Sequence, residues 1–233
     1  MHAQQIQLQE EKPLRPAVTK KIEALGKEIE GVKTERELKD FALFFGLLAA
    51  SVLGRVALKY VPSGLPSVEP IIPFAVLAGL LFGVKEGFVL GSSAYVVSNF
   101  FVPGLQGPWT VFQALGAGLA GLFGGVHRGF GKPTGKALIA LTVFGTLVFE
   151  LIVNVSGGLL GIGWFTGLMG LPLYFLTSLP FSAVHTLTNA GFAAFLKPLL
   201  SLRKNDEQKF SLVSLTRAVN GKRLTVRMLK SNE

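Results

Sequence analysis

The sequence of 233 residues contains no cysteine, and only 16% of its residues are charged. Without cysteine, the chain has no disulfide scaffold, no thiolate metal ligand and no cysteine nucleophile. Soluble domains carry about 25% charged residues on average, whereas this chain has a mean hydropathy of +0.49. It is therefore too apolar for an ordinary soluble domain.

Sequence motifs of common soluble enzymes are also missing. The chain has no phosphate-binding loop that ends in Gly-Lys-Ser/Thr and no Gly-x-Ser-x-Gly elbow. Its three histidines, His2, His127 and His185, are too far apart in sequence for a zinc pair at helical spacing. We therefore expect no catalytic centre, no metal ion and no cofactor, and no ATP hydrolysis through a phosphate-binding loop.

The charged residues that are present gather at the two ends. Residues 1–40 hold 8 basic and 8 acidic side chains, and residues 201–233 hold 8 and 3. The 160 residues between them hold only 7 basic and 3 acidic side chains. This pattern predicts an integral membrane protein, and the net charge of +9 favours tails that face lipid headgroups over nucleic-acid binding.

Proline, glycine and polar residues divide the apolar middle, residues 41–200, into six candidate spans. The spans are Phe41–Tyr60, Ile71–Phe82, Gly87–Val102, Trp109–Val126, Lys136–Leu160 and Leu171–Leu200. Five or seven spans remain open because residues 157–172 are rich in glycine, and Pro180 predicts a kink or break in the last span. The predicted fold is an all-α integral membrane protein, a six-helix transmembrane bundle with cytoplasmic N- and C-terminal extensions.

The basic residues of the connections set the orientation. Connections 61–70, 103–108 and 161–170 contain no Lys or Arg. The connections on the other side contain Lys85, Arg128, Lys132 and Lys136. By the positive-inside rule, both termini of this multi-pass protein of the plasma membrane face the cytoplasm.

The two extensions are expected to differ. Residues 1–40 lack the apolar core of a cleavable signal peptide. They predict a charged helix, either a solvated stalk or a partner-docking element. Residues 201–233 form a basic tail in which Asn220-Gly221 predicts a small β-hairpin.

Polar side chains concentrate at the predicted outer end of the spans. Arg55 lies in the outer half of the first span with Lys59 one turn later, and Glu69 is a candidate counter-charge. Further polar or aromatic residues of this end are Ser98, Asn99, Gln106, Trp109, Thr110, Gln113, Asn154 and Trp164. Segments that meet at one membrane side can form a pocket between helices, although the two tryptophans could instead belong to an interfacial belt.

Glu150 and His185 are the ionisable residues nearest the middle of the spans. An intramembrane acid suggests a functional site, but a structural role is slightly favoured, since Asn154 follows Glu150 by four residues and Asn189 follows His185 by four. Two alternative functions remain open. One is a membrane enzyme that acts on a lipid or isoprenoid with these two residues as acid and base, and the other is a structural membrane protein.

Small residues recur at four-residue spacing in the first span, at Gly46, Ala50 and Gly54. They give one helix face on which another helix can approach closely, either within the bundle or from a separate membrane subunit. The glycines between Gly116 and Gly125 make the fourth span similarly slim, and there internal packing is favoured.

One region resembles a known family. Its segments are Gly54-Arg-Val-Ala57, Pro66-Ser-Val-Glu-Pro70, the run Leu77–Phe88, Val97-Ser-Asn-Phe-Phe101 and Gln106-Gly-Pro-Trp-Thr110, with Gln113. Together they resemble the substrate-binding S components of energy-coupling factor (ECF) vitamin transporters, and most of all the branch that includes cobalamin-specific members. The matching region covers roughly residues 46–125.

The resemblance implies a six-helix membrane subunit that binds a vitamin, best assigned as cobalamin or a corrinoid, near its outer face. It implies as partners a transmembrane coupling subunit and two cytoplasmic ATPase subunits, with Gly46, Ala50 and Gly54 at the family's docking face. This chain has Val111-Phe112 where the family usually has Pro-Trp, and Leu105 where the family often has Gly. These two differences concern the identity of the ligand more than the class of subunit.

The substrate site expected from this resemblance takes its members from several spans. Hydrogen bonds and aromatic contacts would come from Asn99, Gln106, Trp109, Gln113, Asn154 and Trp164, and Arg55 would meet an anionic or carbonyl-rich group. The extensions 1–40 and 201–233 have no counterpart in the family.

Overall fold

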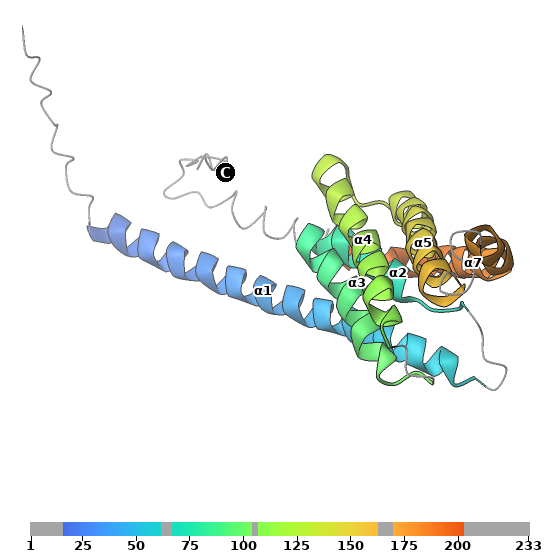
Figure 1. Ribbon diagram of the computed structural model, residues 1–233. Helices are drawn as coiled ribbons and strands as arrows, with labels where there is room; N and C mark the ends of the chain where they lie inside the picture. Colours follow the sequence, from blue (N-terminus) through green and yellow to red (C-terminus); the bar gives the residue numbers. More distant parts are fainter. Residues whose placement is uncertain (1–15, 62–66, 104–106, 163–169, 203–233) are drawn as a thin grey trace, which may run out of the picture. The chain divides into compact units, whose positions relative to one another are not determined.

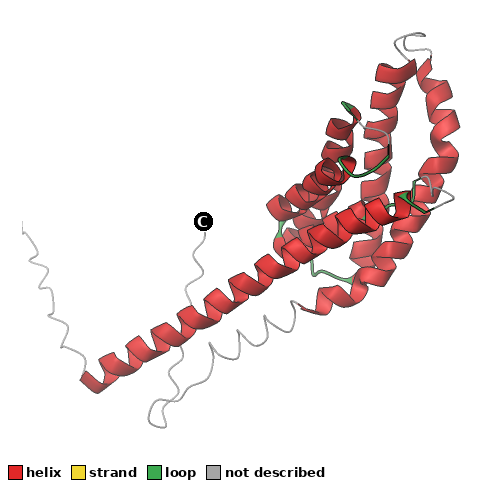
Figure 2. Cartoon of the chain, turned by 90° about the horizontal axis from the view of Figure 1, so that it is seen from below, coloured by secondary structure: helices red, strands yellow, loops and turns green. Residues whose placement is uncertain are grey.

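The structure is a computed structural model that describes residues 16–61, 67–103, 107–162 and 170–202. These residues form helices and no strand (Figure 2). The helices are α1 (Pro16–Lys59), α2 (Ile71–Phe82), α3 (Val84–Asn99), α4 (Trp109–Phe130), α5 (Gly135–Gly157), the π-helical turn η1 (Gly158–Ile162), α7 (Gly170–Leu196) and the 3-10 turn η3 (Lys197–Leu199). The all-helical prediction is confirmed for the described residues, and the hairpin predicted at Asn220-Gly221 lies outside them.

The chain divides into two units, Met1–Lys39 and Asp40–Glu233. The described part of the first unit is helical and carries exposed ion pairs one turn apart, such as Lys39 Nζ with Glu35 Oε1 at 2.6 Å. The sequence predicted a charged helix in residues 1–40 and a first span, Phe41–Tyr60. A single helix, α1, runs from Pro16 to Lys59, because residues 32–45 contain neither glycine nor proline to end it.

In the second unit, α2 is the buried centre. Its twelve residues make a helix of about 18 Å, well short of the ~30 Å hydrocarbon core of a bilayer. All residues from Ile71 to Leu81 are buried except Phe74, which is partly buried. Gly83 ends α2 and begins α3 with φ 133° and ψ −175°, a conformation open essentially only to glycine. This glycine allows two helices to follow each other without a loop.

Helices α2, α3 and α4 pack through glycines, and α3 and α4 lie side by side (Figure 1). A Cβ atom on Gly79 would overlap the carbonyl oxygen of Gly121, and one on Gly121 would overlap that of Gly87. Gly124 meets the carbonyl oxygen of Val76 in the same way. The backbones therefore touch directly, which confirms the prediction of internal packing for the slim fourth span.

The outward sides of several helices are apolar. Phe144, Leu147 and Leu151 are exposed along α5, and Leu176 and Leu187 are exposed along α7. Exposed apolar surface of this extent is typical of contact with a membrane or another protein. Among the described residues, three helices are long and apolar enough to cross a membrane, namely Lys33–Lys59, Trp109–Phe130 and Gly135–Leu160.

Helix α7 does not break at Pro180. The sequence predicted a kink or break there, but a single helix runs from Gly170 to Leu196 with Pro180 inside it. Proline removes one backbone hydrogen bond from a helix interior. The rest of α7 remains helical on both sides, and it carries Ser182 and His185 in the turns that follow.

Candidate functional site

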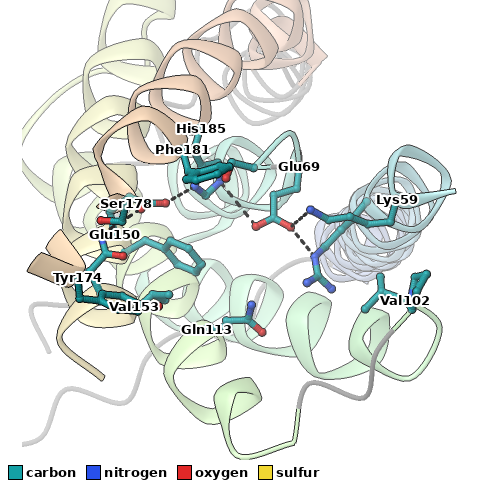
Figure 3. A pocket seen from close by; sticks show the side chains of 15 residues that line it. Lys59, Glu69, Val102, Gln113, Glu150, Val153, Tyr174, Ser178, Phe181 and His185 are labelled. Atoms are coloured by element: carbon teal, nitrogen blue, oxygen red, sulfur yellow. Dashed lines mark hydrogen bonds and ion pairs between the residues drawn. The ribbon is translucent and has the colours of Figure 1, made fainter. Parts of the chain in front are cut away.

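A cavity of about 460 Å³ lies inside the second unit, between α1, α4, α5, α7 and the ends of the connections near them (Figure 3). Most side chains around it are polar or charged, and the others are mainly aromatic or aliphatic. The lining residues are Arg55, Lys59, Ser67, Glu69, Val102, Pro103, Gln113, Phe149, Glu150, Val153, Asn154, Tyr174, Ser178, Phe181 and His185.

Arg55 is the buried cation of the cavity and is only 2% exposed. Its Nε donates to Glu69 Oε2 at 2.6 Å, which confirms Glu69 as its predicted counter-charge. Its Nη1 donates to Ser98 Oγ at 2.7 Å and to Asn99 Oδ1 at 2.6 Å. The guanidinium carbon also lies 4.7 Å from the centre of the Tyr95 ring. Arg55 thus joins α1 to α3 through hydrogen bonds that satisfy a buried charge.

Glu69 lies in the connection before α2, where it gathers contacts from three elements. Its Oε1 accepts a hydrogen bond from the Tyr95 hydroxyl at 2.5 Å, and Lys59 Nζ lies 3.8 Å from its Oε2. Burial alone raises the pKa of this carboxyl, but Arg55, His185, Lys59 and the Tyr95 hydroxyl together lower the pKa to about 2. Glu69 is therefore ionised at neutral pH.

An amide pair connects the Arg55 network to the floor of the cavity. Asn99 Nδ2 donates to Gln113 Oε1 at 2.9 Å and to Thr110 Oγ1 at 2.8 Å. Because both of these partners belong to α4, Asn99 links α3 to α4. It fixes the Gln113 side chain, which faces the cavity (Figure 3).

Glu150 and His185 form the second charged cluster, between α5 and α7. His185 Nδ1 lies 2.6 Å from Glu150 Oε1, and since an ionised carboxylate only accepts, Nδ1 carries the hydrogen. Glu150 Oε2 accepts from Ser182 Oγ at 2.5 Å and from Asn154 Nδ2 at 3.4 Å. His185 Nε2 is buried, has no hydrogen-bond partner in the described part of the chain and lies 3.8 Å from Glu69 Oε1.

The structure brings some of the predicted binding residues together and separates others. Arg55, Gln113 and Asn154 line the cavity, and Asn99 lies one hydrogen bond behind Gln113. Trp109 does not line the cavity, because its ring packs against Gly157 at the end of α5. Gln106 and Trp164 lie outside the described residues.

The small residues of α1 have two different environments. Gly46 and Ala50 are exposed, and a Cβ atom on Gly46 would have no neighbour within 4 Å. A Cβ atom on Gly54 would lie 3.0 Å from Pro70 Cγ. Packing among the described residues therefore accounts for Gly54 but not for Gly46.

Several lining residues were not predicted. Tyr174, Ser178 and Phe181 line the cavity from α7, and Ser182 binds Glu150 beside it. A sequence signal for this face exists, because Ser178, Ser182, His185 and Asn189 are spaced by four, three and four residues in an apolar helix. Such spacing places polar side chains on one helix face.

The site can bind a polar ligand, with charged groups of both signs, amides and aromatic rings inside one cavity. No group of three or more His, Cys, Asp or Glu side chains that could hold a metal ion is found in the part of the chain that the structure describes. No family model, no curated protein and no solved structure matches the chain.

Proposed function

We propose that this chain is the substrate-binding S component of an ECF-type importer that takes up a vitamin or related micronutrient, with cobalamin or another corrinoid as the first candidate. The observation that carries this proposal is the polar cavity inside a helical unit whose outward faces are apolar. In a membrane, such a cavity gives a water-soluble molecule a place to bind between helices. The proposal includes six spans, cytoplasmic termini, a transmembrane coupling subunit and two ATPase subunits.

The size of the cavity bears on the cargo. About 460 Å³ is within the usual range of small-molecule pockets, ~300–1,000 Å³. A corrinoid is larger than the space that the described residues enclose and would extend beyond it, so the test includes smaller vitamins beside cobalamin and its precursor cobinamide. We expect one of them to bind the purified, detergent-solubilised chain tightly and with one-to-one stoichiometry in equilibrium titrations.

The same titrations test whether the cavity is the binding site. Gln113→Ala removes one amide from its floor and is expected to weaken binding about two- to tenfold, as for the loss of one hydrogen bond. The control Val111→Ala changes an exposed residue of the same helix and is expected to leave the affinity unchanged. Failure of every vitamin to bind a protein shown to be folded would refute the proposed function.

The exposed small residues of α1 support docking onto the coupling subunit. Gly46→Leu and Ala50→Leu are expected to abolish vitamin uptake in cells that also produce the coupling subunit and the ATPases. Vitamin binding by the isolated chain is expected to stay unchanged, because both positions are exposed and away from the cavity lining. The control Ala140→Leu places the same side chain at an exposed position of α5.

Either variant could contradict this docking hypothesis. Uptake at the normal rate would show that the Gly46 face is not used. Loss of binding together with uptake would indicate a misfolded chain rather than lost docking.

An enzyme that acts on a lipid or isoprenoid is the second candidate, favoured by the 2.6 Å contact between Glu150 and His185 in the cavity. Glu150 and His185, the candidate acid and base of an enzyme, line this cavity. Asn154 and Gln113, which are expected to bind a vitamin, line the same cavity. The position of the cavity therefore does not separate the two functions. The fate of the bound compound does separate them. Recovery of a bound vitamin unchanged supports import, whereas conversion of a lipid or isoprenoid by the folded chain supports the enzyme.

A further inference from the structure

The α1 end of the cavity carries one net positive charge. Glu69 there pairs with two permanent cations, Arg55 at 2.6 Å and Lys59 at 3.8 Å. Arg55 donates through Nε and Nη1 to Glu69, Ser98 and Asn99, and its side chain is 3% exposed, whereas the Lys59 side chain is 25% exposed. An anionic group of a ligand would therefore meet Lys59 first.

The α5–α7 end has the opposite balance. Glu150 bonds to His185, Ser182 and Asn154, and no Lys or Arg of the described residues pairs with it. Glu150 is the one carboxylate among the described residues that line this end, and no Lys or Arg lines it. The rings of Phe149, Tyr174 and Phe181 line the same region, and aromatic faces attract cations.

Glu150 and Lys59 lie on different sides of the cavity. Glu150 lies on the side of α5 and α7 and Lys59 on the side of α1, with His185 and Glu69 between them (Figure 3). The connecting segments 62–66, 104–106 and 163–169 contain no Asp, Glu, Lys or Arg. Lysine and arginine therefore line the cavity on the α1 side, whereas the α5–α7 side is lined by the carboxylate of Glu150 without either of them.

His185 presents an unpaired polar atom to the cavity. The residue is 1% exposed and lines the cavity, and its Nε2 has no hydrogen-bond partner among the residues that the structure describes. Buried polar atoms of folded proteins are nearly always paired. A polar ligand atom in the middle of the cavity would pair with it.

We infer that the cavity selects a dipolar ligand, with a cationic nitrogen or other positive group at Glu150 and a carboxylate or phosphate at Lys59. This inference rests on the proposed function and narrows its substrate class. Ligands that carry only one sign of charge would leave one end of the cavity without its counter-charge.

The test is a calorimetric titration of the full chain in detergent with vitamins grouped by charge. Thiamin monophosphate, pyridoxamine phosphate and cobalamin carry both signs, biotin and pantothenate only a negative charge, thiamin only a positive charge, and riboflavin neither. We expect the tightest binder to come from the first group. Glu150→Gln and Lys59→Gln are each expected to weaken its binding about ten- to a hundredfold, as for a lost charged hydrogen bond.

Matched controls are Glu86→Gln and Lys85→Gln on α3, which remove the same charges outside the cavity lining and are expected to have no effect. Measuring Glu150→Gln in a His185→Gln background removes the titratable ring, and the same loss of affinity is expected there. Thermal unfolding measures whether each variant is folded. Lys59→Gln lies at a partly exposed position, so it tests the inference even if Glu150→Gln is unstable.

The outcomes are distinguishable. Tightest binding of biotin, pantothenate, thiamin or riboflavin would overturn the inference while leaving the importer in place. Unchanged affinity in Glu150→Gln and Lys59→Gln would do the same. No binding of any of the seven compounds by the folded chain would overturn the proposed function and the inference together.

Discussion

Arg55→Met is expected to lower the free energy of unfolding by about 3–5 kcal/mol. The substitution keeps an apolar stem of similar length but leaves Glu69 buried without its closest cation. It also removes the donor of Ser98 and Asn99, so that two further buried groups lose a partner. Denaturant titration of the detergent-solubilised chain, followed by circular dichroism, measures the effect.

A double variant separates the charge from the packing. Arg55→Met combined with Glu69→Gln removes both charges, and we expect it to recover much of the lost stability, because an uncompensated buried charge costs more than a neutral amide. Lys59→Met serves as the control, with an expected loss of about 1 kcal/mol or less, since its pair is longer and partly exposed. Equal losses in Arg55→Met and Lys59→Met would contradict the central role of Arg55.

Gly121→Ala is expected to lower the free energy of unfolding by about 3 kcal/mol, the upper range for overpacking. Its new methyl group would overlap the carbonyl oxygen of Gly87, which belongs to a backbone and has no rotamer to change. Helices α3 and α4 would have to move apart. The same denaturant titration measures the loss, and thermal unfolding provides a second value.

Gly46→Ala is the matched control for this prediction. It makes the same change in a helix, at a position with no neighbour within 4 Å. We expect it to raise the stability by about 0.5–1 kcal/mol, because alanine restricts the unfolded chain and favours the helix. A similar loss in both variants would contradict the prediction, because only Gly121 lies in the close contact of α3 with α4.

The helix positions could be predicted from the sequence because long apolar runs alternate with proline and glycine. The predicted bounds of α2, Ile71 to Phe82, agree with the structure. Helix α3 begins at Val84 instead of Gly87, because Gly83 turns the chain within one residue. The sequence does not show which of its glycines adopts a positive φ, because such a glycine looks like any other glycine in the sequence.

The candidate site was only partly predictable. Arg55 and Glu69 stand out because the 160 residues of the apolar middle hold so few charges. Glu150 and His185 were recognised one by one, but their contact, between residues 35 apart in sequence, depends on how α5 packs on α7. The unpaired Nε2 of His185 follows from that packing as well, and no sequence pattern encodes it.

Because Glu69 follows α1 closely in the sequence, Arg55 and its counter-charge are made shortly after one another during synthesis. Arg55 is made 14 residues before Glu69, which is about 1–3 s at the usual rate of translation. Its other partners, Ser98 and Asn99, follow 43 and 44 residues after it, roughly 2–9 s later. Arg55 and its counter-charge are therefore both present in the growing chain before Ser98 and Asn99 have been made.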